Sequence, residues 1–170
     1  MFVEIAFIQR FVLFLAHPLY AVAVVLCTFL VFAGLGSRYS PRLQPTGGPS
    51  LAPQIGWPVA VIATLALIYL AVLPLIFRSL MPLSDPLRIA GSIVLIAPLG
   101  FAMGMPFPLG LARLATSAGS LMPWAWGINA CASVVAAILA TVLAIHFGFA
   151  VVIVLAVVLY AIAFAAWRHG

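Results

Sequence analysis

The sequence predicts an all-α integral membrane protein, a polytopic bundle of about five to six transmembrane helices. Hydrophobic residues make up 67% of the 170 residues, and charged residues make up only 5%. A soluble domain carries about 25% charged residues, and a domain this small would leave much of its surface in water. Apolar runs separated by proline and glycine clusters recur along the chain, so lipid is the solvent that suits it.

We expect six apolar segments within one domain, near residues 2–16, 19–36, 57–77, 87–103, 123–145 and 149–167. The first is short for a bilayer of about 30 Å at about 1.5 Å of rise per residue. Pro18 predicts a break after it, because a helix usually ends before the residue that precedes a proline. Gly36 and Arg38 predict the end of the second, because glycine accepts the left-handed conformation and a cation suits a helix C-terminus.

Residues 37–56 form the only long polar stretch, and their prolines and glycines predict a surface loop. The third segment begins with Trp57 and Pro58, which suit an interfacial start and a first-turn proline. Pro74 predicts a kink or an end of that helix. Ser84-Asp85-Pro86 predicts the cap and first turn of the fourth helix.

A helix break is predicted at Gly104, Pro106 and Pro108, since two prolines one residue apart cannot continue a regular helix. Broken helices line substrate sites in transporters, but such breaks also simply end helices at the interface. Both interpretations stay open. The short turn at 146–148 predicts that the last two segments are antiparallel neighbours.

All seven basic residues are arginines, at positions 10, 38, 42, 78, 88, 113 and 168. They form no run or stripe, so nucleic acid is not an expected partner. Most lie at the ends of apolar segments, as membrane topology requires, and their distribution favours both termini in the cytoplasm. We therefore expect a multi-pass protein of the bacterial cytoplasmic (inner) membrane, with the lipid bilayer as its first partner.

Glu4, Gln9 and Arg10 are polar residues within the first apolar segment. A charge near mid-bilayer costs about 2.5–3.5 kcal/mol on insertion scales, so such residues usually face a bundle interior and a partner. Glu4 and Arg10 lie about 120° apart on a helix, which disfavours a mutual pair, whereas Arg10 and His17 share a face. They could mark a proton or substrate site, or a wet interface with Arg10 snorkelling.

Trp126, Asn129 and Ser133 fall at helical spacing on the fifth segment. Asparagine in an apolar helix often hydrogen-bonds a neighbouring helix, and Gly127 with Cys131 forms a small-xxx-small pair that permits close packing. These residues favour a helix-packing face over a binding site.

The sequence offers no set of catalytic residues. It has no Ser-His-Asp set, no phosphate-binding loop and only one Asp and one Glu, so general acid–base chemistry has few candidates. The two cysteines lie inside apolar runs and have no metal-site spacing. We predict no enzymatic activity for the chain alone, and no metal or cofactor.

Four stretches occur in an order that resembles the membrane-embedded C-terminal region of large bacterial spermidine-synthase-like proteins. The stretches are FVEIAFIQRF with LAHPLY (2–11 and 15–20), GLGS (34–37), GMPFPLGL (104–111) and PWAWGIN (123–129). In that family, multi-pass membrane segments are fused to a polyamine aminopropyltransferase-like domain. The resemblance spans nearly the whole chain.

The resemblance does not imply the family's activity, because its soluble domain with the acidic catalytic residues is absent here. It implies a truncated or split relative in which the first helix would belong to a longer one. The leading expectation is thus a non-catalytic anchor or accessory subunit of a larger membrane complex, contacting other subunits or itself. The alternatives are an oligomeric small-solute transporter and the membrane subunit of a split aminopropyltransferase-like enzyme.

Overall fold

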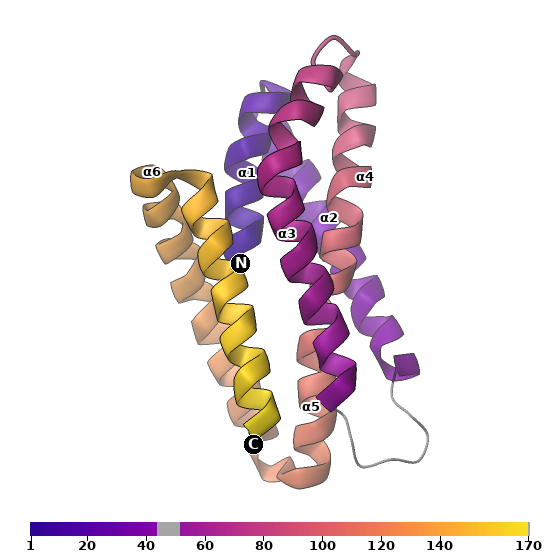
Figure 1. Cartoon of the computed structure of the whole chain (residues 1–170), viewed down its shortest axis with the longest axis vertical. Coiled ribbons are helices and arrows are strands. Elements are labelled where there is room, and N and C mark those ends of the chain that lie inside the picture. The colour runs from indigo at the N-terminus through magenta and orange to yellow at the C-terminus, as the bar shows by residue number, and fades with distance from the viewer. Residues whose placement is uncertain (44–51, 170) are drawn as a thin grey trace.

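The computed structural model describes residues 1–43 and 52–169, and within them it is helical with no strand (Figure 1). The α-helices are α1 (Phe2–Leu15), α2 (Pro18–Tyr39), α3 (Ala52–Leu80), α4 (Asp85–Met103), α5 (Pro106–Ser117) and α6 (Met122–His169). Short 3-10 helices, η1 (Ser40–Leu43) and η2 (Gly119–Leu121), follow α2 and α5. The all-α prediction is confirmed.

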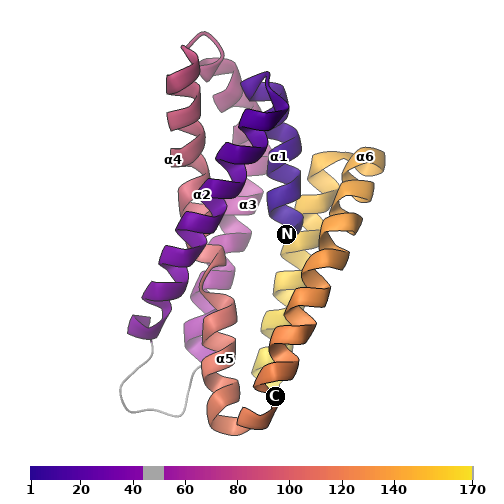
Figure 2. The ribbon, with the colours of Figure 1, turned by 180° about the vertical axis from the view of Figure 1, so that it is seen from behind.

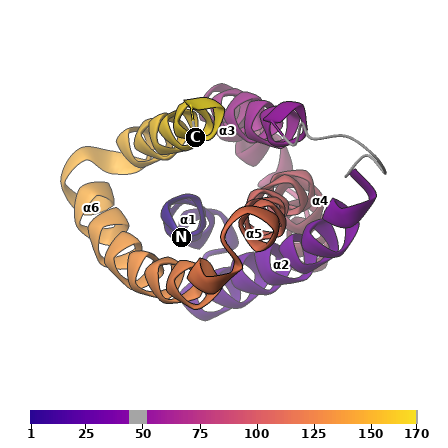
Figure 3. The same ribbon diagram turned by 90° about the horizontal axis from the view of Figure 1, so that it is seen from below.

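The short helix α1 lies inside a ring formed by the other helices (Figure 3). Its side chains at Phe7, Phe11 and Phe14 are fully or almost fully buried and form the centre of the core. The Phe14 ring stacks on the ring of Phe77 from α3, with centroids 4.4 Å apart, and the Phe7 ring meets Phe29 from α2 at 5.7 Å. Aromatic packing therefore joins α1 to its neighbours.

The turn between α1 and α2 occurs at the predicted break. Ala16 has a left-handed backbone (φ 59°), His17 is extended, and Pro18 opens α2 in its first turn, where its missing N–H costs no hydrogen bond. The prediction that Arg10 and His17 share a helix face is wrong, because α1 ends at Leu15.

The prediction that α2 ends at Gly36 is also wrong, since the helix continues to Tyr39. Gly36 is buried, and a Cβ placed on it would collide with the backbone carbonyl of Phe101 in α4. A Cβ on Gly104 would collide in the same way with the carbonyl of Ala33 in α2. These two glycines bring the α2 and α4 backbones together, as small residues do between membrane helices.

Helix α3 extends beyond both predicted ends, starting at Ala52 and continuing through Pro58 and Pro74 to Leu80. The described ends of the predicted loop at 37–56 are therefore helical, and its remaining part, 44–51, lies outside the described residues. Packing against α4 and α6 holds α3 helical past Pro74, at the loss of one backbone hydrogen bond.

The break between α4 and α5 is confirmed, and it is short. Helix α4 ends at Met103 and α5 starts at Pro106. The Gly104 N–H still donates to the Gly100 carbonyl at 3.1 Å, and Met105 N–H donates to the Ala102 carbonyl at 3.3 Å. The chain thus changes hydrogen-bonding pattern without leaving the bundle.

The last two predicted segments form α6, which reverses direction at Gly148 (φ 81°, ψ 174°) (Figures 1 and 2). The two halves run antiparallel, as predicted, but they splay apart around α1 instead of lying against each other (Figure 3). The ring of Phe149, just after the turn, lies 5.9 Å from the ring of Phe7 in α1. Contact with α1 therefore holds the two halves open.

Four helices in the described residues are long and apolar enough to cross a membrane, fewer than the predicted five to six. They cover Pro18–Arg42, Gly56–Leu80, Asp85–Ser117 and Gly119–Ala166. The count is lower because α1 has only 14 residues, and because the last two predicted segments are joined in the single helix α6. Since α6 reverses direction at Gly148, its two halves pass through the bundle separately, so the four helices supply five passes.

Candidate binding site

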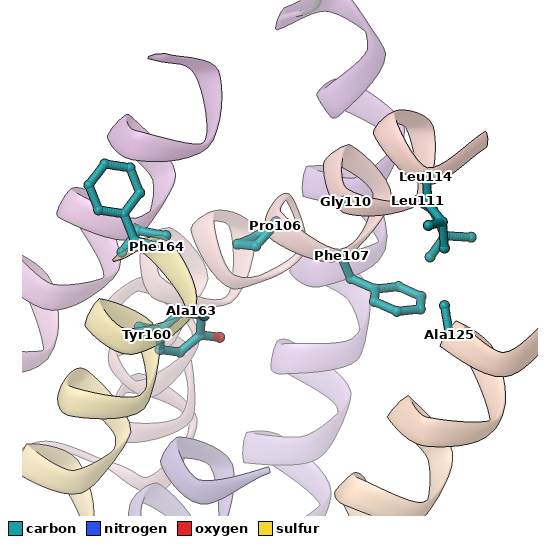
Figure 4. A pocket seen from close by; sticks show the side chains of 10 residues that line it. Pro106, Phe107, Gly110, Leu111, Leu114, Ala125, Tyr160, Ala163 and Phe164 are labelled. Carbon is teal, nitrogen blue, oxygen red and sulfur yellow. The ribbon is translucent and has the colours of Figure 1, made fainter. Parts of the chain in front are cut away.

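An apolar pocket of about 360 Å³ lies where α3, α5 and both halves of α6 face one another (Figure 4). Its lining residues are Val59 of α3, Pro106, Phe107, Gly110, Leu111 and Leu114 of α5, Ala125 of the first half of α6, and Tyr160, Ala163 and Phe164 of the second half. A volume of this size lies within the range of small-molecule sites, about 300–1,000 Å³.

Three local features of the fold create this pocket. The α4–α5 break places Pro106 and Phe107 on the pocket wall. The turn at Gly148 brings Ala125 and Tyr160, which are distant in sequence, to facing walls. Helix α1 covers only part of the bundle's height, so it does not fill the centre of the ring at this level (Figure 1).

Tyr160 supplies the polar atom among the lining side chains. Its hydroxyl is directed toward the space between α6 and α5 (Figure 4), and it has no hydrogen-bond partner within residues 1–43 and 52–169. The Glu4 carboxylate lies near enough to interact electrostatically with Tyr160. The pocket therefore combines a hydrocarbon wall with one hydroxyl group.

The pocket is partly open to its surroundings, and its lining is almost wholly apolar. Contact with other apolar groups is the favourable way to cover such a lining. Water is a poor filler, because a buried water needs about 2–4 polar partners. The lining thus calls for an apolar occupant.

The polar residues predicted in the first segment lie on α1. The Glu4 carboxylate is 3.4 Å from the α-amino group of Met1 and is 19% exposed. The Arg10 guanidinium lies over the Phe149 ring, 5.3 Å from its centroid, and Gln9 is half-buried. The described residues contain no Glu4–Arg10 ion pair, in line with their expected separation around the helix.

His17 lies at the opposite end of the bundle from the apolar pocket. It lines another hollow, of about 370 Å³, with Tyr20 and Asp85, among others. The Asp85 carboxylate is 82% exposed and 3.8 Å from the Arg88 guanidinium. Exposed charges at this distance contribute little, about 0–1 kcal/mol. Neither Glu4 nor Arg10 lines this hollow.

Trp126, Asn129 and Ser133 do not form a shared hydrogen-bonded site. The Trp126 ring meets the Phe107 ring edge-on, with centroids 5.2 Å apart, at the border of the apolar pocket. The Ser133 hydroxyl donates to the Asn129 backbone carbonyl at 2.8 Å. The Asn129 side chain is exposed and has no hydrogen-bond partner in the described part of the chain.

The predicted helix-break residues have separate roles. Gly104 permits the close contact of α4 with α2, and Pro106 lines the apolar pocket. Pro108 is half-buried, in the first turn of α5. Only one of the three therefore contributes directly to the pocket.

A second hollow lies on the outer surface of the first half of α6 and is called the α6 groove here. It measures about 650 Å³ and is lined by Pro123, Trp124, Gly127, Ile128, Cys131, Ala132 and Val135. Nothing lies within 4 Å of a Cβ built on Gly127, and Trp124 is 70% exposed. The predicted small-residue pair thus faces away from the bundle.

Sequence reasoning missed Tyr160, Ala163 and Phe164 because they belong to an apolar run without any polar or periodic signal. No group of three or more His, Cys, Asp or Glu side chains in the described residues could hold a metal ion. In comparisons with known proteins, no family model, no curated protein and no solved structure matches the chain.

Fold and surface together define the class of protein: an all-helical bundle whose apolar helices are suited to a membrane. Large hydrophobic side chains that would face water in a soluble protein are exposed on every spanning helix, including Leu30, Leu67, Val94 and Ile138. In a bilayer these side chains contact lipid.

Proposed function

We propose that this chain is a non-catalytic integral membrane module, an anchor or accessory subunit that packs against another membrane protein. The observation that carries the proposal is the α6 groove, where Gly127 and Cys131 leave the helix backbone open to close approach. Membrane helices associate through such small residues, because lipid gives little hydrophobic driving force between helices.

The resemblance to membrane regions of spermidine-synthase-like proteins supports this role, since those regions are joined to a separate domain. The partner that we propose is accordingly another protein of a bacterial inner membrane. A membrane subunit of a split aminopropyltransferase-like enzyme would be a special case. An aminopropyltransferase-like reading frame next to this one would support that case.

The native cysteines give a direct test of the α6 groove. Cys131 lines the groove, whereas Cys27 is an exposed residue of α2 and serves as the matched control. Oxidative crosslinking in native membranes should yield an adduct that Cys131→Ser removes and Cys27→Ser retains. An adduct of twice 18.0 kDa would indicate self-association, and a larger one another subunit.

A larger side chain in the α6 groove gives a second test of docking. Gly127→Leu should reduce co-purification of the partner, while Gly34→Leu, at another exposed glycine with open space, should leave it unchanged. Crosslinking through both cysteines alike, together with equal co-purification of both leucine variants, would refute the docking role of this groove.

A small-solute transporter is the second candidate, because a broken helix lines the apolar pocket and Glu4 lies near it. Solute uptake into liposomes should then fall in Glu4→Gln and Arg10→Ala variants. Uptake that is unchanged in both variants, or absent from wild-type liposomes, would exclude this candidate.

A further inference from the structure

We propose that the apolar pocket between α5 and α6 binds one acyl chain of an anionic phospholipid, whose phosphate lies at the arginine-bearing end of the bundle. This site is separate from the α6 groove. Its lining comes from α3, α5 and both halves of α6 and shares no residue with the groove.

The dimensions of the pocket fit an acyl chain. Its volume is about 360 Å³. Its wall on α5 runs from Pro106 to Leu114, about 12 Å at about 1.5 Å per residue, which is close to one leaflet of the hydrocarbon core, about 15 Å.

The chemistry of the wall fits a hydrocarbon chain. The lining side chains are apolar except for the hydroxyl group of Tyr160, which faces the pocket (Figure 4). A flexible chain can follow the irregular surface between Phe107, Ala163 and Phe164 without needing polar partners. The pocket is partly open, so a chain can enter from the surrounding lipid.

Charge determines which headgroup suits the site. Arg113 lies on α5 beside the lining residues Leu111 and Leu114, and η1, which carries Arg42, contacts α5. Arg38 and Arg42 are exposed, and the Arg42 guanidinium lies over the Tyr39 ring at 5.6 Å.

The exposed Arg38 and Arg42 form no ion pair with an acidic side chain in the described residues. The chain has only two acidic residues, Asp85 at the opposite end and Glu4 in the first turn of α1. Basic residues at one membrane face attract anionic headgroups. The arginine-bearing end therefore selects a phospholipid with net negative charge.

Lipid retention by the full chain tests the proposal. The protein is reconstituted in vesicles of equal phosphatidylglycerol and phosphatidylcholine, extracted again in mild detergent, washed, and analysed for bound lipid by mass spectrometry. Wild type should retain close to one phospholipid per chain, enriched in phosphatidylglycerol.

Filling the pocket should release the lipid. Ala163→Phe should lower retention by about tenfold or more, a loss of affinity that one well-placed side chain can cause. The matched control Ala161→Phe, at an exposed position on another face of the same helix, should retain wild-type lipid. Ala125→Leu, on the opposite wall, with Ala130→Leu as control, repeats the test if the phenylalanine variant does not fold.

The arginine variants test the headgroup. Arg42→Gln combined with Arg113→Gln should return the retained lipids toward the equal ratio of the vesicles. Pocket-filling variants that retain as much lipid as their controls would overturn the proposal. Retention by wild type without preference for phosphatidylglycerol would also overturn it.

Discussion

Replacing Gly36 by alanine should strongly destabilise the bundle, because the added methyl group would have to enter the α2–α4 contact. A Cβ at Gly36 would collide with the Phe101 carbonyl, which belongs to a helix backbone and cannot rotate away. Overpacking of a close-packed contact costs about 1–3 kcal/mol, and the rigid neighbour places this case near the upper end.

Alanine also recovers helix propensity, about 0.5–1 kcal/mol relative to glycine. The net expectation for Gly36→Ala is a loss of about 2 kcal/mol, which lowers the folding equilibrium constant by about 30-fold. The control is Gly34→Ala, two residues earlier in the same helix, where nothing lies within 4 Å of the added Cβ. That variant should gain about 0.5–1 kcal/mol from propensity alone.

Unfolding by sodium dodecyl sulfate in mixed micelles, followed by circular dichroism and tryptophan fluorescence, measures both free energies. The two variants should differ by about 3 kcal/mol. Gly104→Ala should resemble Gly36→Ala, and the double variant should be less than additive, because both glycines serve one helix contact. Equal stabilities of Gly34→Ala and Gly36→Ala would refute the reasoning.

Three further substitutions can be measured in the same unfolding assay. Tyr69→Phe removes the hydroxyl that donates to the Leu95 carbonyl between α3 and α4, and should cost about 0.5–1.5 kcal/mol; no change would show that this bond adds nothing. Gly148→Ala should cost about 1–3 kcal/mol, because φ is 81° in a region open essentially to glycine; a neutral result would contradict the turn geometry. Phe11→Ala, at a side chain with 0% exposure, should cost about 3–5 kcal/mol, whereas Leu13→Ala, 72% exposed, should be nearly neutral; similar losses would contradict the assigned core.

The prolines and glycines of the sequence predicted most of the turns. Pro18 opens α2, Ser84-Asp85-Pro86 opens α4, Gly148 reverses α6, and Pro106 opens α5 after the break. Proline fixes its own φ angle, and glycine allows backbone conformations that other residues rarely adopt. Both effects are local, so they can be inferred from the sequence. Pro58 and Pro74 in α3 and Pro98 in α4 are exceptions, because packing against neighbouring helices keeps the backbone helical through them.

The candidate site was much less accessible to sequence reasoning. Pro106 was predicted at a helix break, but the facing residues Val59, Ala125 and Tyr160 come from three separate apolar runs. No polar signal marks them, and their meeting depends on the turn of α6 and the short reach of α1. The polar residues that drew attention, such as Arg10 and His17, lie outside the pocket lining.

The sequence by itself determined the class of this protein, because 5% charged residues in 170 cannot cover a water-facing surface. It also determined that helices begin or turn at Pro18, Pro106 and Gly148. Only the tertiary structure decided which apolar side chains face lipid, which fill the core, and which surround the pocket. In a membrane the two surroundings of a side chain are almost equally apolar, so hydrophobicity alone cannot distinguish an inward face from an outward one.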